Sequence, residues 1–238
     1  MIKHGLFIVL LFFLIIIVQS CNRTGEERRT VPSKLQSLLP AVQIKDFDGN
    51  IYHAVTIGRQ TWMVENLKVT HYRNGDPIPE VTGAQWCRLS TGALCNYNND
   101  TTNSRVYGRL YNWHAVNDKR NICPPGWHVP TDDEWFLLSS YLGGEGVAGG
   151  KLKEAGIGRW SYPNAGATNE SGFTALPGGY RSIKGVFQIL DTYCFYWTTT
   201  PYSANSAFCR FLQYDYEGIS RLDNSETYGF SVRCLKDN

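Results

Sequence analysis

The segment from Cys123 to Leu138 brings a cysteine, three prolines and the start of a helix close together, and it constrains the fold more than any other stretch. The prolines hold the chain extended before Thr131, because each one fixes its own φ and restricts the residue before it. Thr131 followed three residues later by Glu134 predicts a capping box, so we expect a helix from about 132 to 142. Cys123 is therefore expected to lie rigidly just before a well-capped helix.

A second cysteine, Cys234, lies near the end of the sequence in a predicted strand. We expect a disulfide between Cys123 and Cys234 that closes the domain. Six cysteines remain after Cys21, and fifteen pairings are open to them. The spacing of the others favours two local bonds, Cys87 with Cys95 and Cys194 with Cys209. No CxxC pair occurs, which argues against a zinc cluster, and we expect no metal and no cofactor.

The N-terminus has the pattern of an export signal. The uninterrupted apolar run of residues 6–18 is shorter than the roughly 20 residues of a membrane-spanning helix and fits a signal peptide. Val18-Gln19-Ser20-Cys21 resembles a bacterial lipobox, which predicts cleavage before Cys21 and lipid attachment to it. An ordinary secreted protein and a single-span anchor are the alternatives. Because Asn22 is not the aspartate of inner-membrane retention, we expect an outer-membrane or cell-surface location.

Composition and pattern describe the rest of the chain as one globular domain. The chain has 42% hydrophobic and 18% charged residues and a net charge of +2, without a basic block that would favour nucleic acid as a partner. We expect a signal peptide over 1–20, a tether over 21–40 and a domain over 41–238. Alternating residues around the turn at 48–50 predict a hairpin, and several strands after two helices predict an α+β fold. We also expect a helix at 109–116 and loops at 96–104 and 143–150.

Several separated motifs in the body of the chain resemble the Fibrobacter succinogenes major paralogous domain family. They are Ile57-Gly58-x-Gln60-x-Trp62-Met63-x-Glu65-Asn66-Leu67, Tyr72-x-Asn74-Gly75, Tyr107-Gly108-x-Leu110-Tyr111-Asn112-Trp113, the segment that starts at Cys123, Asn169 to Arg181, Tyr196-Trp197-Thr198-Thr199 and Gly229 to Cys234. The resemblance implies a C-type-lectin-like fold, with two helices, short twisted antiparallel sheets and a long loop region. It also implies an exported bacterial surface protein and no established enzymatic activity.

The sequence favours binding over catalysis. It contains no HExxH motif, no GxSxG motif and no phosphate-binding loop. The GxGxxG match at 144–149 follows a helix rather than a strand, which argues against a dinucleotide site. The lectin-like scaffold also hosts oxidases with a reactive cysteine pair, but every cysteine here has a plausible structural partner. We therefore expect no enzyme.

The loop region 159–172 contains the candidate ligand-binding residues. Aromatic rings and amides in one loop suit a glycan or a protein ligand equally, and the candidates are Trp160, Tyr162, Asn164, Asn169 and Glu170. A purely structural turn at 169–172 is the alternative. The calcium-dependent sugar motifs of true C-type lectins are absent. A binding or adhesion module is the leading hypothesis and a structural envelope or appendage component is the second. We also expect Arg181 and Arg233 to pair with buried carboxylates such as Glu65 or Glu134.

Overall fold

A computed structural model describes residues 43–238 of the protein, which form one compact unit of mixed α/β structure. The predicted signal peptide, the lipid-attachment residue Cys21 and the tether lie outside the described residues. No helix within residues 43–238 is both long and apolar enough to cross a membrane.

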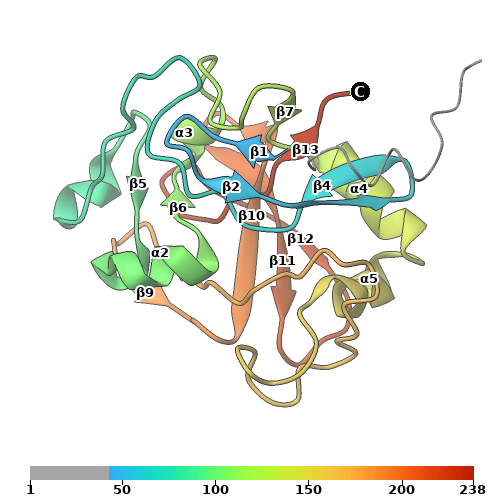
Figure 1. Ribbon diagram of the computed structural model, residues 1–238. Helices are drawn as coiled ribbons and strands as arrows, with labels where there is room; N and C mark the ends of the chain where they lie inside the picture. Colours follow the sequence, from blue (N-terminus) through green and yellow to red (C-terminus); the bar gives the residue numbers. More distant parts are fainter. Residues whose placement is uncertain (1–42) are drawn as a thin grey trace, which may run out of the picture. The chain divides into compact units, whose positions relative to one another are not determined.

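The described elements are short helices and small antiparallel sheets (Figure 1). The helices are η1 (Ala84–Arg88), η2 (Tyr97–Asn99), α2 (Thr101–Tyr107), α3 (Trp113–Val116), α4 (Asp132–Tyr141) and α5 (Glu145–Leu152). The strands are β1 (Ile44–Lys45), β2 (Ile51–Tyr52), β3 (Ala54–Ile57), β4 (Gln60–Met63), β5 (Leu94–Cys95), β6 (Leu110–Tyr111), β7 (Trp127–His128), β8 (Tyr180–Arg181), β9 (Phe187–Gln188), β10 (Tyr193–Ser203), β11 (Ser206–Gln213), β12 (Ser220–Ser225) and β13 (Leu235–Lys236).

The centre of the domain is the long hairpin of β10 and β11, to which β12 adds a third strand. Strand β10 runs through the middle of the ribbon in Figure 1. Alternate residues of a strand point to opposite faces, and here both faces are covered. Phe195 and Trp197 belong to one hydrophobic cluster, whereas Cys194 and Tyr196 belong to another. The hairpin therefore joins two parts of the core.

Helix α4 begins where the sequence predicts. The Thr131 side chain accepts a hydrogen bond from the Glu134 backbone N–H, and the Thr131 backbone N–H donates to the Glu134 side chain. This confirms the capping box. The predicted apolar face is also confirmed, because Trp135, Leu138 and Leu142 are all buried.

The C-terminal strand is connected to earlier parts of the chain by a disulfide and by a sheet. Cys123 and Cys234 form the predicted disulfide, and their Cα atoms are 6.1 Å apart. Directly after Cys234, strand β13 lies between β4 and β7 in a four-stranded sheet, where Leu235 pairs with Trp62 and with His128. Strand β13 is therefore paired along both of its edges, and the residue before it is disulfide-bonded.

The other two predicted disulfides are wrong for this structure, in which Cys194, Cys209, Cys87 and Cys95 are free thiols. In the β10–β11 hairpin, Cys194 lies opposite Leu212 and Cys209 lies opposite Trp197, three positions along the strand. Three positions correspond to about 10 Å, beyond the reach of a disulfide. The two thiols also belong to different hydrophobic clusters on opposite sheet faces.

The Cys87–Cys95 pair fails because the two side chains have different environments. Cys87 lies exposed on η1, where its Sγ donates to the backbone carbonyl of Ala84. Cys95 is fully buried in β5, and burial raises the pKa of its thiol to about 12. Hairpin spacing alone therefore does not predict a bond here.

Three predicted element assignments are also wrong. The expected helix at 109–116 is strand β6 followed by the short helix α3, and the expected loop at 96–104 contains η2 and the start of α2. The expected loop at 143–150 holds most of α5, despite its glycines. A Cβ atom on Gly149 would lie 1.9 Å from the Gly218 carbonyl oxygen, and one on Gly150 would lie 2.3 Å from that of Gly166. These glycines allow the helix to pack directly against backbone.

Candidate functional site

The predicted loop 159–172 uses most of its candidate residues for structure. Trp160 is only 1% exposed, and its indole N–H donates to the carbonyl of Ala175. The Asn164 amide is buried and donates to the carbonyls of Glu154 and Gly156. These two residues therefore hold the loop together and offer little surface to a ligand.

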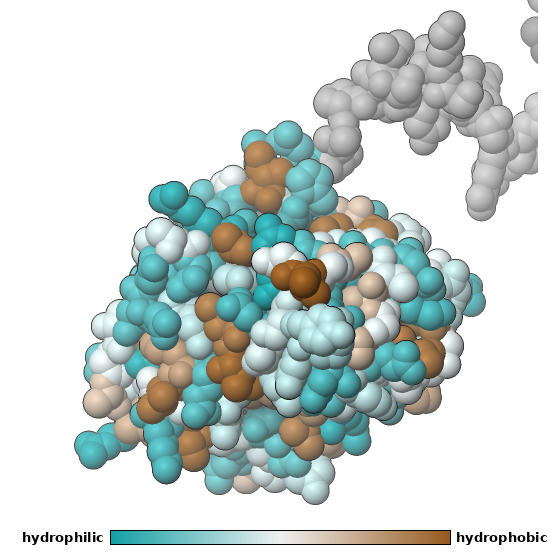
Figure 2. Space-filling view, turned by 90° about the horizontal axis from the view of Figure 1, so that it is seen from below, coloured by the Kyte–Doolittle hydropathy of each residue, from teal (hydrophilic) through white to brown (hydrophobic). Residues whose placement is uncertain are grey.

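Of the remaining three candidates, Asn169 is used within a turn, and Tyr162 and Glu170 are exposed. Asn169 exchanges hydrogen bonds with Thr174, which supports the alternative of a structural turn. Tyr162 is 80% exposed, and Glu170 forms an ion pair with Lys151 at 3.0 Å. Figure 2 views the molecule from below and shows apolar side chains in small separate patches rather than one broad surface. The loop thus does not bring the five predicted residues together as a site.

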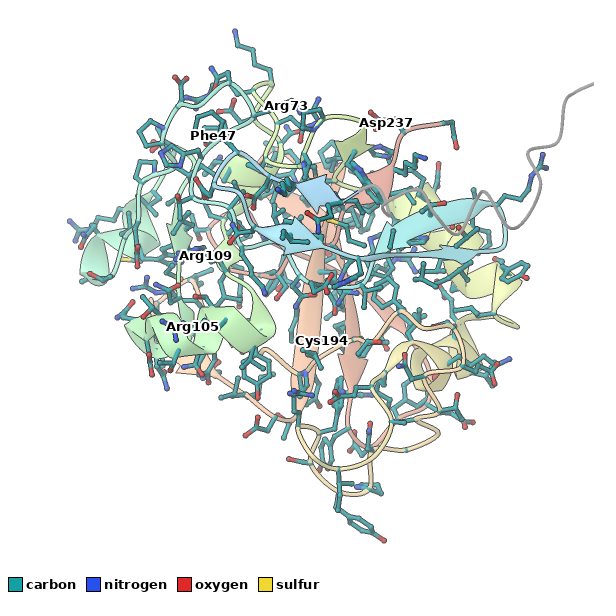
Figure 3. The ribbon with its side chains drawn as sticks, in the orientation of Figure 1. Phe47, Arg73, Arg105, Arg109, Cys194 and Asp237 are labelled. Carbon is teal, nitrogen blue, oxygen red and sulfur yellow. A yellow bond between two sulfur atoms is a disulfide. The ribbon has the colours of Figure 1, made fainter. Side chains whose placement is uncertain are left out.

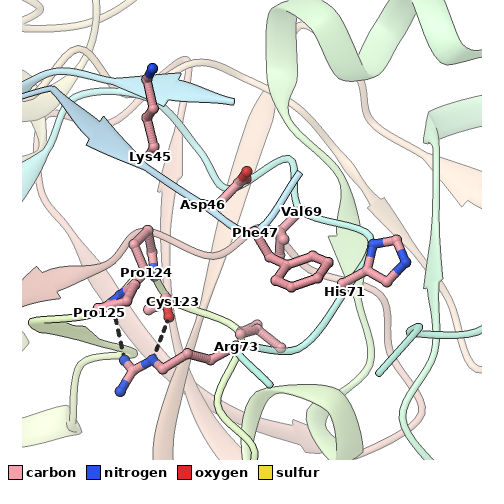
Figure 4. Close-up of a pocket in the computed structure, with 10 residues that line it drawn as sticks. Lys45, Asp46, Phe47, Val69, His71, Arg73, Cys123, Pro124 and Pro125 are labelled. Atoms are coloured by element: carbon pink, nitrogen blue, oxygen red, sulfur yellow. Dashed lines mark hydrogen bonds between the residues drawn. The ribbon is translucent and has the colours of Figure 1, made fainter. Parts of the chain in front are cut away.

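A better candidate is a pocket of about 200 Å³ beside the disulfide, shown in Figure 4. It lies between the turn that follows β1, the segment 69–73 and the segment 122–125. Its side chains include an aromatic ring, basic groups and prolines, namely Lys45, Phe47, His71, Arg73, Pro124 and Pro125. Figure 3 shows that Phe47 and Arg73 lie at the same end of the molecule. We call it the Phe47 pocket.

The tight turn between β1 and β2 places Phe47 in the pocket. Asp46 accepts hydrogen bonds from the backbone and side-chain nitrogens of Asn50 and from the Tyr52 hydroxyl, the last at 2.6 Å. Gly49 has a φ of 80°, which favours glycine. The turn is therefore closed from inside, and the Phe47 side chain remains 57% exposed.

His71 is fixed next to Phe47 by a carboxylate. Its Nδ1 lies 2.5 Å from Asp48 Oδ1, and its ring centroid is 5.2 Å from that of Phe47. Asp48 also accepts hydrogen bonds from the Thr70 backbone N–H and hydroxyl. Partial burial by itself would raise the pKa of Asp48, but these hydrogen bonds outweigh it and lower the pKa. Asp48 therefore stays ionised and orients the imidazole.

Arg73 connects the pocket to the disulfide. Its Nε donates to the carbonyl of Cys123, and its Nη2 donates to the carbonyls of Pro124 and Trp127. These contacts hold the proline wall of the pocket against the segment 69–73. The pocket is consequently built on a part of the chain that a covalent bond and a sheet also restrain.

The Phe47 pocket combines an exposed aromatic ring with polar and charged side chains. An exposed ring beside polar groups allows stacking and directional hydrogen bonds at once. Its volume suits one monosaccharide unit or one side chain rather than a large cofactor. Within residues 43–238, no group of three or more His, Cys, Asp or Glu side chains is placed to hold a metal ion.

A wider hollow of about 600 Å³ lies on the neighbouring surface beside Trp113 and His114. It is lined mostly by loop residues, and His114 Nδ1 lies 3.5 Å from Glu226 Oε2. Trp113 is largely buried there, and its indole N–H is already used by the Thr198 carbonyl. This hollow therefore offers less aromatic surface than the Phe47 pocket.

Sequence reasoning missed Phe47, His71 and Arg73 as site residues. The turn Asp46-Phe47-Asp48-Gly49-Asn50 was informative, because a large aromatic residue in so polar a turn has no core to enter. The proximity of His71, which is 23 residues from Asp48, depends on the tertiary fold.

Comparison with protein-family models gives a match over residues 55–236 to the Fibrobacter succinogenes major domain. The chain belongs to this family. Comparison with curated proteins and with solved structures gives no match. The match covers nearly all of the described unit and confirms the family resemblance seen in the motifs.

The motif residues of this Fibrobacter succinogenes major domain mainly build its frame. Asn112 caps α3 through the Ala115 backbone N–H, and the Trp197 indole donates to the Tyr111 carbonyl. Gly108 has a φ of 77°, and a Cβ atom there would lie 2.6 Å from that of Asn66. Phe47 precedes the matched region, so family membership alone does not assign a ligand to the Phe47 pocket.

Proposed function

We propose that this Fibrobacter succinogenes major domain is a binding or adhesion module on a bacterial surface, with the end unit of a glycan held in the Phe47 pocket. The observation that carries the proposal is the exposed Phe47 ring above a pocket of about 200 Å³. Sugar rings present C–H groups that pack on an aromatic face while their hydroxyls bond to polar neighbours. The disulfide-bonded frame supports this by keeping the pocket walls in place.

A glycan array tests this function on the full exported chain, with Phe47→Ala as the key variant. Tyr162→Ala is the matched control, because it removes an even more exposed ring from the loop 159–172. We expect Phe47→Ala to weaken glycan binding at least about fivefold and the control to leave it unchanged, since stacking is worth about 1 kcal/mol or more.

Other outcomes of the array separate the competing functions. Loss of binding in the control but not in Phe47→Ala would move the site to the loop 159–172. Binding of a surface protein, without any glycan, would replace the glycan with a protein ligand. No ligand of either kind would favour the second hypothesis, a structural envelope or appendage component. We propose no reaction for this domain.

We further propose that Cys21 carries a lipid that anchors the chain to the outer membrane, and that the domain has a C-type-lectin-like fold. The apolar run 6–18 followed by Ser20-Cys21 supports the first proposal, and the small antiparallel sheets with few helices support the second. Metabolic labelling with a clickable fatty acid tests the anchor. We expect label on the wild-type chain and none on Cys21→Ala; an unlabelled wild type would contradict it. An experimental structure tests the fold.

A further inference from the structure

The acidic groups around the Phe47 pocket are already used by the protein. Asp46 is only 7% exposed and accepts the three hydrogen bonds that close the β1–β2 turn. Asp48 accepts from Thr70 and His71. Their oxygen atoms therefore face the protein, and they offer a ligand few acceptors.

The basic groups of the pocket have donors to spare. Arg73 is exposed, and its three hydrogen bonds go to uncharged carbonyls through Nε and Nη2. Its Nη1 has no acceptor among the described residues, and no described carboxylate forms an ion pair with Arg73. Lys45 is exposed at the rim and likewise has no ion-pair partner within residues 43–238. The two basic side chains of the pocket thus have no carboxylate partner among the described residues, whereas Asp46 and Asp48 are already engaged in hydrogen bonds.

From this distribution we infer that the preferred ligand of the Phe47 pocket is a sugar unit that carries a carboxylate, such as a uronic acid at the end of a glycan. This inference rests on the proposed function and names its ligand class. The sugar ring packs on Phe47, and its carboxylate accepts a hydrogen bond from Arg73 Nη1. The exposed Lys45 side chain, which points away from Arg73 in Figure 4, turns toward the pocket and donates to the same carboxylate. Hydrogen bonds between a carboxylate and a guanidinium or ammonium are stronger than those of a neutral hydroxyl.

Matched pairs of sugars test the inference directly. Titration calorimetry compares the full chain with oligosaccharides that end in glucuronate or glucose, and in galacturonate or galactose, which differ only in a carboxylate or a hydroxymethyl group. We expect each acidic sugar to bind at least about tenfold more tightly than its neutral partner. This preference should shrink at high salt, because Lys45 and Arg73 are exposed to solvent.

Charge-removing variants locate the preference. Lys45→Gln and Arg73→Gln should each reduce the ratio of acidic to neutral affinity about tenfold, whereas Lys184→Gln, an exposed lysine on the β8–β9 turn, should leave it unchanged. Melting curves accompany Arg73→Gln, because Arg73 also bonds backbone carbonyls. If that variant unfolds, Lys45→Gln decides alone, since the Lys45 side chain has no hydrogen-bond or ion-pair partner within residues 43–238.

The outcomes distinguish this inference from the proposed function. Equal affinity for acidic and neutral sugars, both lost in Phe47→Ala, overturns the acidic ligand and keeps the glycan-binding module. An acidic preference that survives Lys45→Gln in a folded protein also overturns the inference. Absence of binding to every sugar overturns the proposed function itself.

Discussion

Two buried arginines, Arg181 and Arg233, are satisfied by uncharged carbonyl oxygens where carboxylates were expected. Arg181 donates to the carbonyls of Val81, Thr82, Gly83 and Gly185, and its guanidinium lies 4.5 Å from the centre of the Trp86 ring. Arg233 donates to Asn66 Oδ1 and to two carbonyls. The predicted pairing of both arginines with Glu65 or Glu134 is therefore wrong. Loop backbone supplies several acceptors at once, and a planar guanidinium can collect them.

Glu134 instead takes part in a contact that depends on pH. The two ring nitrogens of His128 face two carboxylates, with Nδ1 at 2.6 Å from Asp237 Oδ1 and Nε2 at 3.0 Å from Glu134 Oε1. Both nitrogens can donate only when the ring is protonated. The hydrogen bond to Glu134, opposed by partial burial and aided by Asp237, raises the pKa of His128.

We expect this contact to stabilise the fold at acidic pH and to weaken as the pH rises. A raised folded pKa means that the folded state binds the proton more tightly, so the stabilisation is complete below the ordinary histidine pKa of about 6.5. It is lost as the pH rises through the raised folded value. Urea unfolding from about pH 5.5 to 8.5 should show that the free energy of unfolding falls by less than about 1 kcal/mol as the pH rises. This fall should be absent in His128→Gln. The same pH profile in both proteins would contradict the assignment.

The burial of Trp160 gives a second prediction at this scale. Trp160→Ala should lower the free energy of unfolding by about 3–5 kcal/mol, because it leaves a cavity and removes the hydrogen bond from the indole to the Ala175 carbonyl. Tyr162→Ala, two residues away but 80% exposed, should change it by less than about 0.5 kcal/mol. Chemical denaturation of both variants measures the difference, and a mild effect of Trp160→Ala would show that the indole is not part of the core.

Among the elements, helix α5 shows how tertiary contacts override local sequence preference. Its glycines disfavour a helix locally, but they permit the close backbone approach described above. Directly after the helix, Lys153 is fully buried, and its ammonium donates to the carbonyls of Ala165, Gln213 and Tyr216 at 2.8–3.0 Å. One side chain thus joins the end of α5, the loop 159–172 and the β11–β12 connection.

Removing this connection should destabilise the domain. Lys153→Met keeps the volume of the side chain but leaves three carbonyls without their donor, and we expect a loss of about 2–4 kcal/mol of unfolding free energy. Lys184→Met is the exposed control and should cost less than about 0.5 kcal/mol. Hydrogen exchange should show increased opening in the loop 159–172 of Lys153→Met only. Unchanged protection there would contradict the role of Lys153.

At the scale of the whole domain, one disulfide and a shared sheet close the chain. The Cys123–Cys234 bond joins residues 111 positions apart, so in the chain-entropy model it stabilises the fold by about 4–5 kcal/mol. Strand β13 makes the same closure through hydrogen bonds to β4 and β7. Cys194, labelled near the centre of the view in Figure 3, is fully buried. Two large hydrophobic clusters, both rich in aromatic residues, stabilise the fold together with this single disulfide.

Thiol titration checks this arrangement in a Cys21→Ser form of the chain. We expect one thiol, that of exposed Cys87, to react rapidly in the native protein, and four to react after unfolding without reductant. Cys95, Cys194 and Cys209 are buried, and burial raises each thiol pKa to about 12, which keeps them protonated and unreactive. No reactive thiol after unfolding would restore the two local disulfides predicted from spacing.

The family, the hairpin turn at 48–50 and helix α4 with its capping box could be predicted from sequence, because each depends on residues close together or on a motif pattern. The Cys123–Cys234 bond was also predicted, but it joins residues 111 positions apart and was predicted together with two local bonds that are wrong. Strand register and contacts between distant segments decided the rest. They determine which cysteines stay free, the helix in the glycine-rich segment, the partners of Arg181 and Arg233, and the Phe47 pocket. Cys194 and Cys209 differ by sheet face, which spacing does not encode. Likewise, Phe47 and His71 meet only because the β1–β2 turn lies against the segment 69–73 once the core has formed.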